Sequence, residues 1–275
     1  MALIPQFFLD CAVAIAVPLP KKQIKWIASG FLYGDFFEKG EKGKKLYHVY
    51  LVTNRHVFKE LKQVLLRFNP TGKEAAKQYS LDLVDASSKK MLWTPHPNPN
   101  IDIAVIGINV KLLREHKIQV AYFRSDQHIA TLDKIAELGI TEGDFVYTLG
   151  FPMGLIGPER NYVIVRSGNI ARIQDAIDHR SNEFLIDAFI FPGNSGGPVV
   201  TKPEAMAIRE TKAVSSAYLV GVIQSYVPYQ DVAISVQTKR PRVVFEENSG
   251  LTSVIPIDFV KEAIGAYEET RAKGT

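Results

Sequence analysis

A serine stands in a glycine-rich turn of this 275-residue chain. Residues 191–198 read Phe-Pro-Gly-Asn-Ser-Gly-Gly-Pro, which places Ser195 between glycines. Glycine permits the positive φ angles and the close backbone approach that let N–H groups converge on a developing oxyanion. Ser195 is therefore a candidate nucleophile, and the N–H groups of Gly193 and Ser195 are candidate oxyanion donors. The alternative is a plain glycine-rich hairpin between strands at Phe184–Ile190 and Pro198–Thr201.

A serine hydroxyl needs a base and an orienting carboxylate before it acts as a nucleophile. The chain contains a candidate for each. His56 follows the apolar segment 51–53, and Asp102 precedes the apolar run 103–106. Alone, this histidine is typical of a hydrogen-bonded strand end, and this aspartate of a turn or cap. Taken with Ser195, they favour a catalytic triad.

The three segments resemble the histidine, aspartate and serine motifs of trypsin-like (chymotrypsin-fold) serine proteases, and among these the HtrA/Deg branch. The matching segments are Val52-Thr53-Asn54-Arg55-His56-Val57, Asp102-Ile103-Ala104-Val105 and Phe191–Pro198. Residues 143–155 and 165–170 also resemble segments of that branch, so the similarity extends over most of the chain. One departure is Phe191, where the HtrA motif usually has a small polar residue.

The resemblance implies a serine endopeptidase that hydrolyses protein substrates through an acyl-enzyme. His56 would take the proton of Ser195, and Asp102 would orient the imidazole. Asn194 stands where trypsin-like zymogens carry the aspartate that pairs with a newly freed amino terminus. We therefore expect activity without zymogen cleavage. The family needs no cofactor, and because the other histidines lack metal-ligand spacing we expect no metal site.

Two other functions are compatible with the sequence. The chain could be a catalytically latent peptide-binding or scaffolding protein, because a motif does not show whether the loops hold the oxyanion donors in place. A nucleic-acid-binding barrel would need a basic surface. The net charge is only +4, and most of the lysine clusters are interleaved with acidic or neutral residues. We expect a protein or peptide substrate, leave an activating protein partner open, and expect neither nucleic acid nor membrane as a partner.

The resemblance also places a substrate pocket. In this fold the pocket is framed by residues just before the nucleophile and by the strand that follows it. The corresponding residues are Phe189, Phe191, Gln224, Ser225 and Tyr226. Since no aspartate stands at position 189, we expect preference for a small or medium apolar residue before the cut rather than for Arg or Lys.

Short apolar segments rich in Val, Ile, Phe and Tyr, bounded by Gly, Pro, Asn and Asp, predict an all-β fold. We expect two six-stranded antiparallel β-barrels (chymotrypsin-like) with a C-terminal α-helix, together one peptidase unit over residues 1–275. The expected parts are a first barrel at 10–110, a connecting segment at 111–140, a second barrel at 141–255 and a helix at 256–272 packed on the second barrel. The first barrel is expected to contain strands at Cys11–Val17, Trp26–Gly34, Tyr47–Thr53, Val64–Phe68, Leu81–Asp85 and Ile103–Ile108. The active site would lie in the cleft between the barrels.

The single cysteine, Cys11, rules out an intramolecular disulfide and favours a reducing compartment, or a bacterial lineage that does without disulfides. The amino-terminal apolar stretch has no preceding basic region and is interrupted by Asp10, unlike a signal peptide. We therefore expect a cytoplasmic protein. Few residues follow the expected C-terminal helix, so we expect no PDZ domain of the kind that many HtrA proteins carry.

Overall fold

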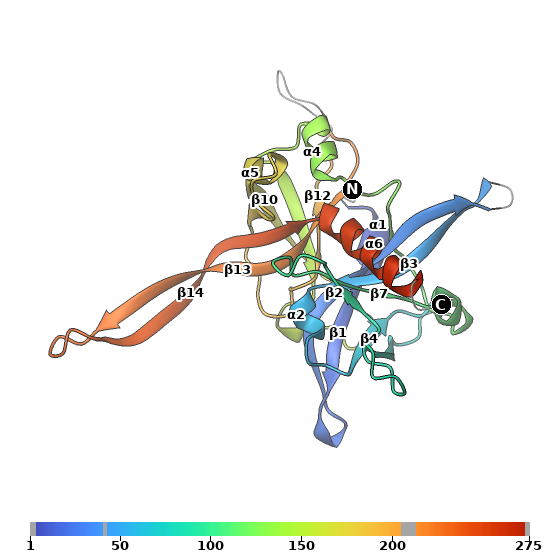
Figure 1. Ribbon diagram of the computed structural model, residues 1–275, viewed down its shortest axis with the longest axis horizontal. Helices are drawn as coiled ribbons and strands as arrows, with labels where there is room; N and C mark the ends of the chain where they lie inside the picture. The colour runs from blue at the N-terminus through green and yellow to red at the C-terminus, as the bar shows by residue number, and fades with distance from the viewer. Residues whose placement is uncertain (1–3, 41–42, 205–212, 273–275) are drawn as a thin grey trace.

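The computed structural model describes residues 4–40, 43–204 and 213–272, and its strands form two sheets (Figure 1). The fold is mostly β with a C-terminal helix, as the sequence predicts. The first sheet contains β1 (Ala12–Pro18), β2 (Ile24–Lys39), β3 (Lys45–Thr53), β4 (Gln63–Phe68), β5 (Lys77–Asp82), β6 (Thr94–Pro95), β7 (Ala104–Gly107) and β8 (Phe123–Arg124). Its order is β5-β4-β1-β2-β3-β7-β6, with β8 parallel to β2.

The first sheet differs in two respects from the expected six-stranded barrel. It has eight strands, and its end strands β5 and β6 do not pair with each other. The strand expected at Leu81–Asp85 lies further toward the amino terminus, at Lys77–Asp82. The shift arises because β5 pairs along the whole of β4, whereas Asp85 instead caps a turn by accepting hydrogen bonds from Ser87 and Ser88. Cys11 ends a short helix rather than opening β1 and is buried, as expected of a small apolar residue.

The second sheet is the expected closed six-stranded barrel. Its strands are β9 (Phe145–Gly150), β10 (Ile164–Arg172), β11 (Phe184–Asp187), β12 (Pro198–Thr201), β13 (Leu219–Ile234) and β14 (Pro241–Pro256), in the order β10-β11-β14-β13-β12-β9. Strands β11 and β12 flank the glycine-rich turn but are not neighbours in the barrel. The hairpin alternative for residues 191–197 is therefore wrong, and the turn is a connection between separated strands.

Most of the helices are short and lie in the connections between strands, and the last helix is the longest. They are α1 (Gln6–Cys11), η1 (Pro20–Lys22), α2 (Arg55–Phe58), α3 (Val110–Glu115), α4 (Leu132–Leu138), η3 (Pro152–Gly154), α5 (Gln174–Ile177) and α6 (Asp258–Ala272). Among the described residues, no helix combines the length and apolar character needed to cross a bilayer.

Helix α6 was expected to pack on the second barrel. It instead packs mainly against β6 and β7 of the first sheet. Its Glu262 lies 3.1 Å from the buried His96, and the ring of Tyr267 packs edge-on against Tyr50. The absence of a side chain at Gly107 leaves room for the hydroxyl of Tyr267. Because α6 follows β14 directly, it ties the two sheets together.

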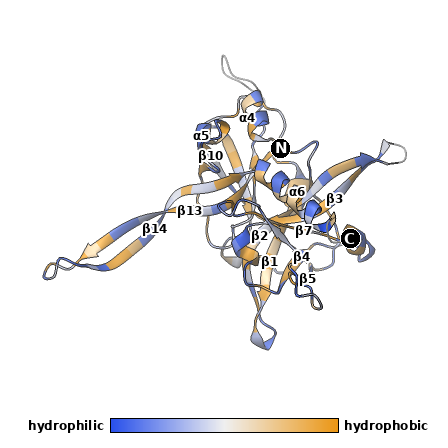
Figure 2. Ribbon diagram, viewed as in Figure 1, coloured by the Kyte–Doolittle hydropathy of each residue, from blue (hydrophilic) through white to orange (hydrophobic). Residues whose placement is uncertain are grey.

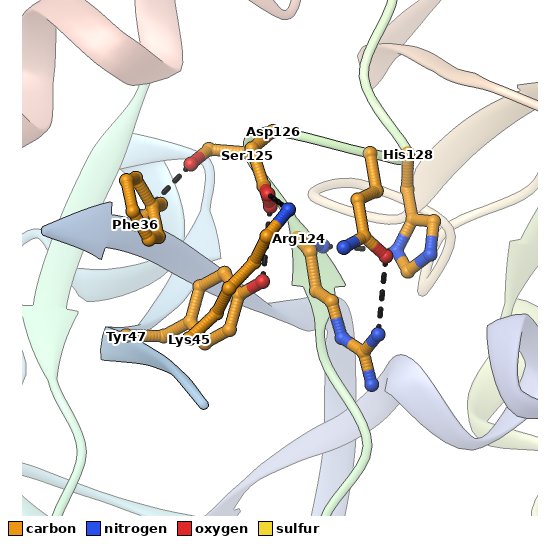
Figure 3. Close-up of polar contacts among 8 residues, drawn as sticks. Phe36, Lys45, Tyr47, Arg124, Ser125, Asp126 and His128 are labelled. Carbon is orange, nitrogen blue, oxygen red and sulfur yellow. Dashed lines mark hydrogen bonds and ion pairs between the residues drawn. The ribbon is translucent and has the colours of Figure 1, made fainter. Parts of the chain in front are cut away.

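A polar cluster fixes the β2–β3 hairpin to the segment that joins the two sheets (Figure 3). Lys45 forms an ion pair with Asp126, and the hydroxyl of Tyr47 donates to the same carboxylate at 3.0 Å. Two residues further along, Nδ1 of His128 accepts the backbone N–H of Arg124 at 3.0 Å. This acceptor role requires that Nδ1 carry no proton.

His128 is expected to make the folded protein sensitive to acid. Burial, and then the charge of Arg124, lowers the pKa of His128 from 6.5 to about 4. Below pH 6.5 the unfolded chain binds a proton that the folded chain refuses until about pH 4, so stability falls as the pH drops through this window. We expect His128→Asn, which keeps a hydrogen-bond acceptor, to remove part of that loss. Melting curves recorded at several pH values would test this, and parallel curves for the two proteins would contradict it.

Strands β13 and β14 continue beyond the barrel as a two-stranded arm, residues 227–248, that projects from the body (Figure 1). Their pairing reaches Ile234↔Pro241 near the tip. The neighbouring strands β12 and β11 pair only with the barrel portions of β13 and β14. The sequence does not predict this arm, and the basic residues Lys239, Arg240 and Arg242 lie at its tip.

Candidate active site

His56 and Asp102 come together at one end of the first sheet. His56 lies in α2, directly after β3, and Asp102 lies just before β7, which is the neighbour of β3. His56 Nδ1 donates to Oδ2 of Asp102 at 2.5 Å, and the backbone N–H of His56 donates to Oδ1 at 3.0 Å. The Asp102 side chain is 16% exposed and that of His56 is 52% exposed. The carboxylate therefore orients an imidazole whose Nε2 is left available as the basic nitrogen.

Asn54 fixes the backbone of this pair. It is fully buried at the end of β3, and its side chain donates to the carbonyl oxygen of Asp102 at 2.9 Å. The next residue, Arg55, donates its backbone N–H to the same oxygen at 3.3 Å. The turn that carries His56 is thus hydrogen-bonded to the segment before β7 that carries Asp102.

The turn that carries Ser195 depends on two glycines. Gly193 has φ of +103°, and a Cβ atom there would stand 2.5 Å from the carbonyl oxygen of Phe151. Gly196 has φ of +82°, and a Cβ atom there would collide with Oγ1 of Thr53 and the carbonyl oxygen of Ser29. Both positions therefore exclude larger residues, and Gly196 brings the serine turn against the end of β3.

Two N–H groups of this turn have a fixed direction and no protein acceptor among the described residues. They belong to Gly193 and Ser195. In a trans peptide the C=O and N–H point in opposite directions, so a bond to one sets the other. The carbonyl of Pro192 accepts from Met153 N at 2.6 Å, and that of Asn194 accepts from Gly197 N at 2.9 Å. The N–H groups of Gly193 and Ser195 are consequently each held in one direction.

Ser29 is a residue of the site that the sequence interpretation missed. It is fully buried in β2, and its hydroxyl donates to the carbonyl of Gly193 at 2.6 Å while accepting the N–H of Phe151 at 2.9 Å. Its backbone N–H donates to the carbonyl of Ser195 at 3.0 Å, and its own carbonyl accepts from Oγ1 of Thr53 at 2.8 Å. The available signal was a serine within the otherwise apolar segment 26–33.

These contacts bring the serine turn of the second barrel to the histidine end of the first sheet. Thr53 lies three residues before His56, and the backbone of Ser195 is bonded to Ser29, which is bonded to Thr53. Within the described chain there is no hydrogen bond between the Ser195 hydroxyl and His56.

The expected pocket residues lie on β13 and near the serine turn. Phe189 is half-exposed beside Gly250, and the guanidinium of Arg166 lies 5.4 Å from the ring centre of Phe191. The hydroxyl of Tyr226 donates to Glu246 at 2.9 Å, Ser225 is exposed, and Oε1 of Gln224 lies 3.4 Å from Oγ of Ser253, whose proton goes to Glu183. A preference for an apolar residue before the cut stays a prediction.

The arrangement is that of a trypsin-like peptidase: a closed second barrel that contributes the serine and a first sheet that contributes the histidine and the aspartate. A family model of the trypsin-like peptidase domain matches residues 28–206, which is more than half of the chain. The chain therefore belongs to the trypsin-like peptidase family. The match does not distinguish the HtrA/Deg branch, which stays a prediction. Among curated proteins, none matches the chain.

Proposed function

We propose that this protein is a serine endopeptidase that acts through His56, Asp102 and Ser195. The observation that carries the proposal is the 2.5 Å contact between His56 Nδ1 and Asp102, in a family member that also holds Ser195 in a glycine turn. Nε2 of His56 takes the hydroxyl proton while Oγ of Ser195 attacks the substrate carbonyl carbon. His56 then gives this proton to the departing amine, and water releases the acyl group by the same steps.

The oxyanion would be held by the N–H groups of Gly193 and Ser195. Their orientation is supported by the contacts of Pro192 and Asn194 with neighbouring backbone. Asn194 is fully buried, and its Oδ1 accepts the N–H of Phe191 at 3.1 Å. Because this bond is made by a neutral amide within the turn, no ammonium group is required to order it. This contact supports activity without zymogen cleavage.

The proposal is tested by labelling the purified full chain, without prior proteolysis, with a fluorophosphonate probe. We expect covalent labelling of the wild-type protein and none of Ser195→Ala, because the probe reacts only with a serine activated by its base. Ser167→Ala, which removes a serine of β10, is the matched control and should label normally. Absence of labelling in the wild type would contradict the proposal and favour the latent peptide-binding alternative.

A further inference from the structure

The arm, residues 227–248, exposes apolar side chains on both of its faces. They include Tyr229, Val232, Ile234, Val243, Val244 and Phe245, each 41–59% exposed. Figure 2 shows these hydrophobic stretches on a ribbon that stands away from the rest of the molecule. A two-stranded ribbon with no further strand or layer is at best marginally stable in water. We therefore expect a partner to add strands to the arm or to cover its apolar side chains.

The outer edge of β14 along the arm is open for backbone pairing. Strand β11 covers β14 only from Leu251 to Val254, which leaves the arm portion without a neighbour on that side. Each arm strand has one proline at an end, Pro241 in β14 and Pro228 in β13, and residues 242–248 of β14 contain none. An unpaired edge without proline is a template for another strand. Residues 242–248 of β14 are thus suited to pairing with another strand.

This edge is complementary to itself when a second copy runs antiparallel. Pairing centred on Val244 places Val244 opposite its own equivalent and Val243 opposite Phe245 of the second copy. The same register places Arg242 opposite Glu246 of the second copy. Residues opposite each other on antiparallel strands point to the same face, as a twofold axis normal to the sheet demands. The register joins a β-branched side chain with an aromatic one and joins opposite charges, both of which stabilise sheets.

The charges on the arm fit this arrangement. Within the described part of the chain, Arg242 has no ion-pair partner. The carboxylate of Glu246 is oriented by the hydroxyl of Tyr226 at 2.9 Å and by Nε2 of Gln230 at 3.3 Å. The end of the arm far from the barrel carries Lys239, Arg240 and Arg242, whereas the end next to the barrel carries Glu246 and Glu247. Two antiparallel arms therefore bring opposite charges together at both ends.

We propose that a second copy of this chain binds the β14 edge of the arm, so that the two arms form one four-stranded antiparallel sheet. The contact is isologous, since the same residues serve both copies. It covers the open edge and extends the two-stranded ribbon to the number of strands that is stable in water. The inference does not depend on the proposed catalytic triad, and the arm lies outside the segment matched by the peptidase family.

The test is sedimentation velocity of the full chain over a wide range of concentrations. We expect a monomer–dimer equilibrium that shifts toward monomer at high salt. Arg242→Glu and Glu246→Arg should each weaken association by about tenfold or more, because each places like charges opposite one another. An equimolar mixture of the two variants should regain the dimer, because position 242 of each copy then faces the opposite charge at position 246 of the other. This recovery shows that the variants are folded.

The matched control is Lys62→Glu, an exposed charge reversal of the same size outside the arm, which should leave the equilibrium unchanged. A wild-type chain that stays monomeric at every concentration would overturn the proposal, and the arm would then serve a different partner. A dimer that survives in both Arg242→Glu and Glu246→Arg would also overturn it. So would a mixture of the two variants that fails to associate although each is folded by circular dichroism.

Discussion

Replacing His56 with alanine is expected to lower kcat/KM on a protein substrate by about 10⁵-fold. The substitution removes the base that takes the proton of Ser195, and no other imidazole stands within hydrogen-bonding distance of Asp102 in the described chain. It should not unfold the protein. The backbone N–H of residue 56 still donates to Oδ1 of Asp102, and the lost side chain is half-exposed. We expect the stability to change by no more than about 1 kcal/mol.

The kinetics of a double variant separate a triad from two independent residues. If His56 and Ser195 act as one unit, His56→Ala with Ser195→Ala should be no slower than either single variant. His48→Ala provides the control, because it removes an exposed histidine that lies 3.9 Å from Glu268, outside the site, and it should keep normal activity. A His56→Ala protein that retains most of its kcat/KM would show that another base serves Ser195, or that the observed activity belongs to another site.

The sequence predicts the parts of this fold that short segments determine. Strand β12 and its boundaries follow from an apolar run that begins immediately after a glycine turn, and they are confirmed as Pro198–Thr201. The segments that carry His56 and Asp102 follow from polar residues that border apolar runs, and their pairing was expected only from the resemblance to trypsin-like proteases, because the two residues are 46 positions apart. The boundaries of β12 depend on residues a few positions apart, where chain punctuation and side-chain type are sufficient information.

The parts that were missed depend on distant contacts. The arm contains Asp231, Glu246 and Glu247 among its apolar residues, so its sequence is typical of an exposed loop. Its strand structure depends on pairing between two segments of that kind. Helix α6 was expected on the second barrel, but its position is decided by His96 and Tyr50 of the first sheet. Periodicity shows which face of such a helix is apolar, and not which partner covers it.

Ser29 depends on a contact of the same kind, because its hydroxyl reaches a carbonyl 164 residues away in the chain. The carbonyl belongs to Gly193, whose N–H is one of the two proposed oxyanion donors. Gly193 lies between two peptide planes, and each is held through its carbonyl: the plane before it by Met153 and the plane after it by Ser29. Removing the hydroxyl leaves the plane after Gly193 held only by the N–H of Asn194, which donates to the carbonyl of Phe191 at 3.0 Å. The backbone of Gly193 then rotates more easily, because glycine offers little torsional resistance, and this rotation displaces its donor N–H.

Ser29→Ala is therefore expected to lower kcat by about 10²-fold or more while KM changes little, because an oxyanion donor acts mainly in the transition state. It should also cost about 1–3 kcal/mol of stability, since the carbonyl of Gly193 and the N–H of Phe151 lose a buried partner. Thr201→Val removes a buried hydroxyl that accepts from Tyr218 N at 2.9 Å, away from the site. It should cost similar stability with normal kcat. Equal losses of kcat in the two variants would show that Ser29 supports only the fold, whereas a loss confined to Ser29→Ala would identify it as the residue that positions the oxyanion donors.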